Sequence, residues 1–198
     1  MTALSLVSKG DLAFLCEPAG GGSASVAVDV SEQRTSITDN TTYCSEANSA
    51  RTAIAAPRTI CVVVDMTTGS SGFLVHHGTS AVAYKYAISK SGTNIRLSEN
   101  AAVILTVAIP GLAAASRKFL IHWAQRPDGA FNFNECVIYN FTTAAWVFGS
   151  VTATAITPVS TDTFTIGATT TGTSAYSLGM TAFYTVAAGR RFPPTTEP

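Results

Sequence analysis

The chain has 198 residues, enough for one large domain, and a formal net charge of zero at pH 7. Because neither sign of charge is in excess, no field attracts a polyanion, and nucleic acid is excluded as a predicted partner. Charged residues make up only 12% of the chain and apolar residues 46%, which leaves few charged helix surfaces and a large core. With its abundant Thr and β-branched residues, this composition favours a single all-β domain over residues 1–198.

No targeting or membrane-spanning segment is predicted. The start, MTALSLVSKGDLAFL, lacks the charged region that precedes the apolar stretch of a secretory signal. The longest apolar run, Ala101 to Ala115, is interrupted by Pro110 and is shorter than the roughly 20 residues that cross a bilayer. We therefore expect a soluble chain made in a cytoplasm, without a membrane partner.

The strand signal is weak at first and then strong. Residues 1–30 contain a short apolar run, Leu12 to Cys16, and a strand-like alternation, Ser25 to Val30. Residues 31–58 are polar, and we expect them to form loops with one or two edge strands. From Thr59 onward, strands are predicted at Ile60–Met66, Phe73–His76, Tyr84–Ser89, Ile95–Ser98, Val103–Ile109, Ala145–Ser150, Phe164–Ile166 and Met180–Val186. Turns recur at short intervals and no helical period persists, a pattern typical of a sandwich or barrel.

Two of these predictions concern how strands meet. The turn Ser91–Asn94 joins Tyr84–Ser89 to Ile95–Ser98 in a hairpin. The run Val103–Ile109 is continuous and β-branched, which predicts either a strand buried on both faces or a core strand.

The stretch Lys118 to Thr143 contains the clearest pair of strands. In the first strand, Phe119, Ile121 and Trp123 point to one face, while Leu120, His122 and Ala124 point to the other. Arg126–Gly129 is predicted to be a turn, with Pro127 and Asp128 central and Gly129 leaving at positive φ. The second strand, Cys136 to Phe141, places its aromatic side chains on one face, which predicts packing against another layer.

Four segments in order resemble the concanavalin A-like lectin/glucanase superfamily in its laminin-G-like form. They are GFLVHHG, YKYAISKSGTNIRLS, FLIHWAQRPDG with NECVIYNFTTAAW, and FTIGA with GMTAFYTV. The third departs from the family pattern, because Asn140 to Thr143 stands where the family often has an Asp-Gly turn. The resemblance implies an all-β fold: a two-sheet antiparallel jelly-roll sandwich with one concave sheet.

Glycan-cleaving members of that superfamily carry two Glu residues with an Asp between them on one strand. Their chemistry needs two carboxylates on one face. The glutamates of this chain are Glu17, Glu32, Glu46, Glu99, Glu135 and Glu197, and no two lie within four residues of each other. We therefore predict no enzyme and name no catalytic residue; a glycoside hydrolase stays the disfavoured alternative, because folding could join distant carboxylates.

Metal and thiol chemistry is also not predicted. Asp128 with Asn132 and Asn134 is the nearest approach to a calcium site, but loop residues bonding their own backbone are the favoured interpretation, so no cofactor is expected. His76 and His77 are placed at a strand end, with one ring buried and one solvated. The cysteines, Cys16, Cys44, Cys61 and Cys136, are interpreted as buried free thiols, with a Cys44–Cys61 disulfide left open.

Aromatic side chains offer flat apolar area for stacking on sugars. They could come from Tyr84, Tyr86, Tyr139, Trp146 or Tyr176, although strand spacing is more typical of core. Candidate glycan-binding residues are Tyr176, in a polar Thr/Gly loop, and Trp146, together with the amides of Asn132 and Asn134.

The favoured function is a non-enzymatic structural protein on the surface of a bacteriophage virion, as a minor capsid, decoration or minor tail protein. Low charge, a Thr/Ala-rich strand surface and no recognisable catalytic set support it, by fold-level analogy. Such a protein would be assembled in the host cytoplasm, with other virion proteins or copies of itself as partners and cell-surface glycans as attachment ligands. The alternative is a carbohydrate-binding module or adhesin outside a virion.

Overall fold

The computed structural model describes residues 56–156 and 161–169, and the backbone of the strands outside these ranges. The strands are β1 (Glu17–Ala19), β2 (Ala27–Asp29), β3 (Arg34–Ser36), β4 (Tyr43–Glu46), β5 (Arg58–Met66), β6 (Gly72–Ser80), β7 (Ala83–Ser91), β8 (Asn94–Glu99), β9 (Ala102–Ala108), β10 (Arg117–Asp128), β11 (Phe131–Asn140), β12 (Ala145–Thr154), β13 (Thr163–Ile166) and β14 (Met180–Val186). No stretch of the described residues forms a helix that could span a membrane.

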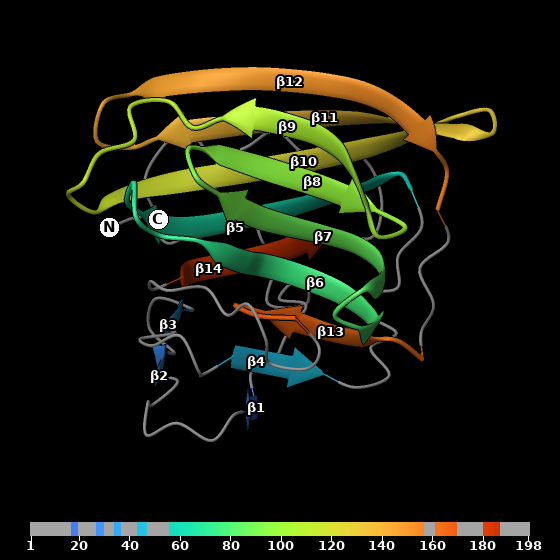
Figure 1. Ribbon diagram of the computed structural model, residues 1–198, viewed down its shortest axis with the longest axis horizontal. Coiled ribbons are helices and arrows are strands. Elements are labelled where there is room, and N and C mark those ends of the chain that lie inside the picture. Colours follow the sequence, from blue (N-terminus) through green and yellow to red (C-terminus); the bar gives the residue numbers. More distant parts are fainter. Residues whose placement is uncertain are drawn as a thin grey trace.

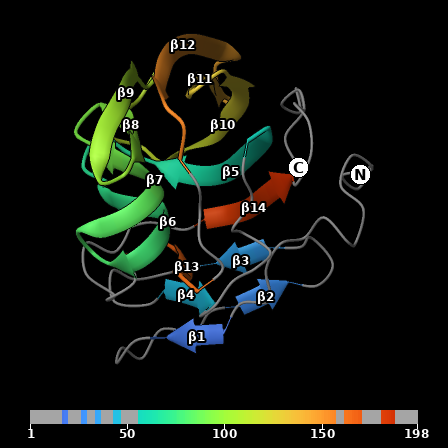
Figure 2. The same ribbon diagram turned by 90° about the vertical axis from the view of Figure 1, so that its right-hand side faces the viewer.

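The strands form two antiparallel sheets that lie face to face (Figure 1). One sheet has seven strands in the order β1-β4-β13-β6-β7-β8-β9, and the other has five in the order β12-β11-β10-β5-β14. A separate hairpin, β2-β3, lies beside β14 (Figure 2). The chain passes between the sheets after β4, β5, β9, β12 and β13, so neighbours in a sheet are often distant in sequence. The predicted all-β jelly-roll sandwich is confirmed.

The core lies between the two sheets and follows the alternation of the strands. From the five-stranded sheet it takes side chains such as Val62, Phe119 and Trp123, and from the seven-stranded sheet side chains such as Ile88 and Phe164. Each of these is fully buried. Burying a large apolar side chain contributes about 1.5–3 kcal/mol, so this shared interior holds the sheets together.

The second face of the five-stranded sheet is apolar where β5 and β10 lie side by side. Cys61, Val63 and Leu120 are buried there, and Tyr139 and Phe141 pack partly against them. The last two rings meet edge to face, with centroids 5.1 Å apart. The prediction that β10 points different residues to opposite faces is confirmed, because Leu120 and Trp123 fall in different clusters.

The predicted turn at Arg126–Gly129 is wrong in its position. β10 continues through Pro127 to Asp128, which pairs with Phe131, so the loop consists of Gly129 and Ala130 alone. Gly129 has a φ of 64°, as the prediction required. A glycine with positive φ at the first loop position matches the right-handed twist of the two long strands. The chain therefore turns at Gly129 and Ala130, and Pro127 stays in the strand.

Of the two alternatives for Val103–Ile109, burial on both faces is wrong, whereas Val107 and Ile109 do belong to the core. β9 is the last strand of the seven-stranded sheet, and 52% of the Val103 side chain is exposed. Val107 does face the core, beside Gly149 of β12, the last strand of the other sheet. A continuous apolar run does not reveal whether a strand lies inside a sheet or at its edge, because that depends on strand order.

Candidate functional site

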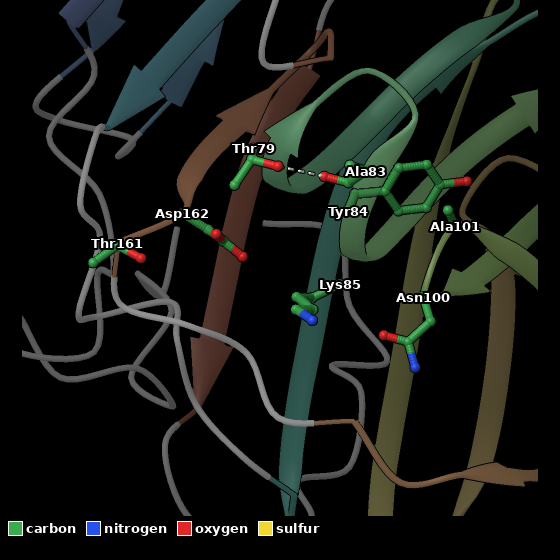
Figure 3. Close-up of a pocket in the computed structure, with 8 residues that line it drawn as sticks. All are labelled: Thr79, Ala83, Tyr84, Lys85, Asn100, Ala101, Thr161 and Asp162. Atoms are coloured by element: carbon green, nitrogen blue, oxygen red, sulfur yellow. Dashed lines mark hydrogen bonds between the residues drawn. The ribbon is translucent and has the colours of Figure 1, made fainter.

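An open pocket of about 460 Å³ lies at one end of the seven-stranded sheet. Three connections meet there: the β6–β7 turn, the β8–β9 turn and the two residues before β13. They meet because neighbouring strands among β13, β6, β7 and β8 run antiparallel, so these three connections lie at the same end of the sandwich. Its lining is Thr79, Ala83, Tyr84, Lys85, Asn100, Ala101, Thr161 and Asp162 (Figure 3).

Asp162 supplies the carboxylate of this pocket. The residue is only 4% exposed, yet it makes no hydrogen bond or ion pair with any described residue. In Figure 3 its side chain is directed from the β13 side of the pocket toward the Lys85 side. Because a buried carboxylate is costly without partners, this group is poised to accept hydrogen bonds from a ligand.

Lys85 and Asn100 supply the donors on the opposite side. The backbone N–H of Asn100 donates to the carbonyl oxygen of Lys85 at 3.0 Å, which ties the β8–β9 turn to β7. Lys85 is half-buried and Asn100 is exposed, and neither side chain is engaged by another described residue. An ammonium and an amide that face a carboxylate can together bind a molecule that carries both donors and acceptors.

The β8–β9 turn has an unusual backbone. Glu99 pairs with Ala102, so the loop is Asn100 and Ala101, with φ values of 47° and 61°. Two consecutive positive φ values are the requirement of a type I′ turn, which Asn favours and Ala does not. This turn aims Asn100 at the pocket.

Tyr84 also lines the pocket, and its ring packs against other rings. Its ring centroid lies 4.8 Å from that of His76 and 6.2 Å from that of Phe73. On the other side of β6, His77 stacks on Tyr86 at 4.9 Å. These ring contacts hold the Tyr84 side chain in one orientation.

A buried polar network lies between the sheets, directly behind the β8–β9 turn. Gln125 accepts a hydrogen bond from Arg58 Nε and donates to Glu99. Gln125 also donates to Asn134 Oδ1 at 2.7 Å, and Trp123 Nε1 donates to the same oxygen at 2.8 Å. Since Glu99 is the residue before Asn100, the network anchors the turn that lines the pocket.

The charges of this network are costly to bury. Arg58 Nη2 lies 3.9 Å from Glu99 Oε1, and the guanidinium lies 4.1 Å from the centroid of the Tyr86 ring. Burial lowers the pKa of Arg58 and raises the pKa of Glu99, whereas Gln125 and Arg58 pull the pKa of Glu99 back down. A buried charged network such as this one fixes how the two sheets are aligned more than it adds to the net stability of the fold.

The structure separates the sequence-predicted glycan candidates. Asn132 and Asn134 are buried between the sheets, where Asn134 belongs to the polar network. Trp146 lies on the outer face of β12 and is 66% exposed. Tyr176 is outside the described residues. Neither Trp146 nor the two asparagines line the pocket.

The residues that line the pocket could not be predicted together from the sequence. Tyr84 is among the aromatic candidates, but no sequence pattern links Lys85, Asn100 and Asp162, because they belong to a strand and two connections that are far apart in the chain. Asn100 before Ala101 at the end of a strand is the one local hint, since Asn is enriched at positive φ.

The predictions for histidine and cysteine need correction. His76 and His77 lie in the middle of β6 and both are fully buried, so the predicted solvated ring does not exist. Burial lowers the pKa of each to about 4. Cys61 and Cys136 are buried free thiols, which confirms that interpretation for these two and rules out the Cys44–Cys61 disulfide.

Burial raises the pKa of both described thiols to about 12, so they are unreactive in the folded chain. Cys16 and the side chain of Cys44 lie outside the described residues. Within residues 56–156 and 161–169, no three potential ligands gather as a metal site would require.

No family model matches the sequence, and no curated protein matches it. Among solved structures, the chain is similar to a native heptameric SAP-like pentraxin from Limulus polyphemus, at 14% identity and a TM-score of 0.45, over 66% of this chain and 64% of the pentraxin chain. It is similar to a toad ovary galectin in complex with thio-digalactose, at 10% identity and a TM-score of 0.36, over 73% of this chain and 98% of the galectin.

A third similar structure is CG-16, a homodimeric agglutinin from chicken liver, at 9% identity and a TM-score of 0.38, over 73% of this chain and 99% of the agglutinin. At identities this low, no binding residue transfers from these proteins.

Proposed function

We propose that this chain is a carbohydrate-binding domain and that its binding site is the pocket lined by Tyr84, Lys85, Asn100 and Asp162. One observation carries the proposal: Asp162 is 4% exposed, is unpartnered among the described residues and points into an open pocket. Sugar hydroxyls are suited to such a carboxylate, because each donates one hydrogen bond and accepts others.

The remaining chemistry of the pocket supports the same ligand class. Lys85 and Asn100 donate to hydroxyl and ring oxygens, and the ring of Tyr84 offers apolar area to the C–H face of a pyranose. The pocket volume of about 460 Å³ lies within the range of about 300–1,000 Å³ that small-molecule sites occupy.

A glycan array on the purified protein tests the proposal, followed by titration of the best glycan. Asp162→Asn removes the charge and should lower the affinity for that glycan by about 10-fold to 100-fold, since a hydrogen bond to a charged group is worth about 1.5–3 kcal/mol. Asp128→Asn is the matched control, because Asp128 is exposed at the end of β10 and does not line the pocket. If no glycan on the array binds, or if Asp162→Asn and wild type bind the best glycan with equal affinity, the proposal is overturned.

As a second role, we propose that the domain belongs to the surface of a bacteriophage particle, in contact with copies of itself or other virion proteins. The supporting observation is the outer face of β12, where Trp146 is 66% exposed and Phe148 47% exposed on a strand without charged residues. Exposed apolar patches commonly mark protein contacts. Mass spectrometry of purified particles tests this role, and absence of the chain from the particles would overturn the proposal that it is a virion protein.

A further inference from the structure

The pocket is lined by one carboxylate, Asp162, and one ammonium, Lys85, which differ in how far they are buried. Asp162 is 4% exposed, so less water surrounds its charge than surrounds the charge of a half-buried side chain. Lys85 is only half-buried, so the field of its ammonium reaches a ligand through more water. For an anionic ligand, the repulsion from the carboxylate therefore outweighs the attraction from the ammonium.

Asp162 and Lys85 also do not neutralise each other. No ion pair joins these two residues in the described part of the chain, although both line the pocket. A molecule placed between them is required to donate on one side and accept on the other. Uncharged hydroxyl groups meet both requirements, whereas a carboxylate can only accept and would face Asp162.

We infer that the pocket selects neutral pyranose sugars and excludes sugars that carry a carboxylate, such as uronic and sialic acids, with Asp162 as the specificity-determining residue. This inference rests on the proposed function and narrows its ligand class. The mechanism is exclusion, because a like charge placed against the wrong ligand lowers the affinity for that ligand without any added contact to the right one.

Matched pairs of simple sugars test the inference, whichever glycan binds best on the array. Methyl glucoside is compared with methyl glucuronide, and methyl galactoside with methyl galacturonide, by NMR titration at low salt. Wild type should bind the better neutral member at least about 10-fold more tightly than its acidic partner, because a like-charge contact costs more than about 1.4 kcal/mol in a buried site.

Two variants then separate the contributions of the charges. Asp162→Asn should lower the neutral-to-acidic ratio of affinities toward one, while Lys85→Gln should raise it. Asp162→Asn should fold like wild type, because its carboxylate holds no described partner. If Asp162→Asn does not fold, Lys85→Gln still tests the inference, because an unchanged or lower neutral-to-acidic ratio of affinities in that variant would contradict it.

The outcomes distinguish the two proposals. No binding by any of the four sugars, nor by any glycan on the array, overturns the proposed function. Binding in which the acidic member is equal to or tighter than the neutral one leaves carbohydrate binding standing and overturns the inference. A neutral preference that Asp162→Asn leaves unchanged overturns the role assigned to Asp162.

Discussion

At the scale of single residues, buried polar groups have two different roles in this molecule. Arg58 and Glu99 are joined through Gln125 inside the sandwich, where the hydrogen bonds offset the cost of burying charge. Asp162 is buried to a similar degree at the pocket wall and has no such partner among the described residues. The first arrangement supports the structure, and the second is available to a ligand.

The buried histidines give a prediction at this scale. Neither ring nitrogen of His76 or His77 has a hydrogen-bond partner among the described residues, and burial lowers the pKa of each to about 4, against an ordinary value of 6.5. The unfolded chain therefore binds more protons between pH 6.5 and 4. Stability is complete above pH 6.5, and each histidine should lower the free energy of unfolding by about 2 kcal/mol as the pH falls from 7 to 5.

Urea unfolding at pH 7, 6 and 5 checks this prediction against the double variant His76→Phe with His77→Phe. Phenylalanine suits both places, since His76 lies beside Phe73 and His77 packs on Tyr86. The raised pKa of Glu99 acts in the opposite direction but is common to both proteins. Equal pH dependence of the two proteins would contradict the assignment to the histidines.

At the scale of elements, the long strands are ended by short loops with specific backbone requirements. The β7–β8 and β10–β11 loops each have two residues, and glycine supplies the positive φ in both. The β8–β9 loop instead uses Asn100 and Ala101, and the β11–β12 loop uses Ala144 at a φ of 53°. Alanine in this region costs roughly 1–2 kcal/mol, so these two loops are strained.

Ala101→Gly and Ala144→Gly should therefore each raise the free energy of unfolding by about 1 kcal/mol, because glycine adopts positive φ without a steric cost. Denaturant titration measures the change. Ala153→Gly is the control, since Ala153 lies in β12 with an extended backbone, and glycine there should cost about 0.5–1 kcal/mol. A loss of stability in both loop variants would show that the strain is not there.

At the scale of the whole molecule, the two sheets close against each other along β9 and β12. These are the last strands of their sheets, and Gly149 in β12 lies against Leu105 and Val107 in β9. A Cβ atom on Gly149 would lie 2.8 Å from Cγ2 of Val107, which is closer than such atoms approach in proteins. Glycine at this position allows the edges to approach.

Gly149→Ala should push β12 away from β9 and lower the free energy of unfolding by about 1–3 kcal/mol. Adding Val107→Ala removes the opposing methyl group, so the double variant should be more stable than the sum of the two single losses predicts, by about 1 kcal/mol. A double-mutant cycle in urea measures this coupling. Additive losses would mean that the two edges do not press on each other.

Local patterns in the sequence are enough to predict most elements and the layer that many side chains face. Alternation places Trp123 opposite Leu120, and turn residues locate the β7–β8 hairpin, because both signals lie within a few neighbouring residues. β14 is predicted with its observed bounds for the same reason. The family resemblance extends this to the two-sheet arrangement.

Features that depend on residues far apart in the chain became visible in the folded molecule alone. The strand order places β9 at an edge, buries both His76 and His77, and joins Arg58 to Glu99 across the interior. It also brings Tyr84, Asn100 and Asp162 around one pocket. Burial and partnership are set by packing between sheets, where contacts span long separations that no local pattern encodes.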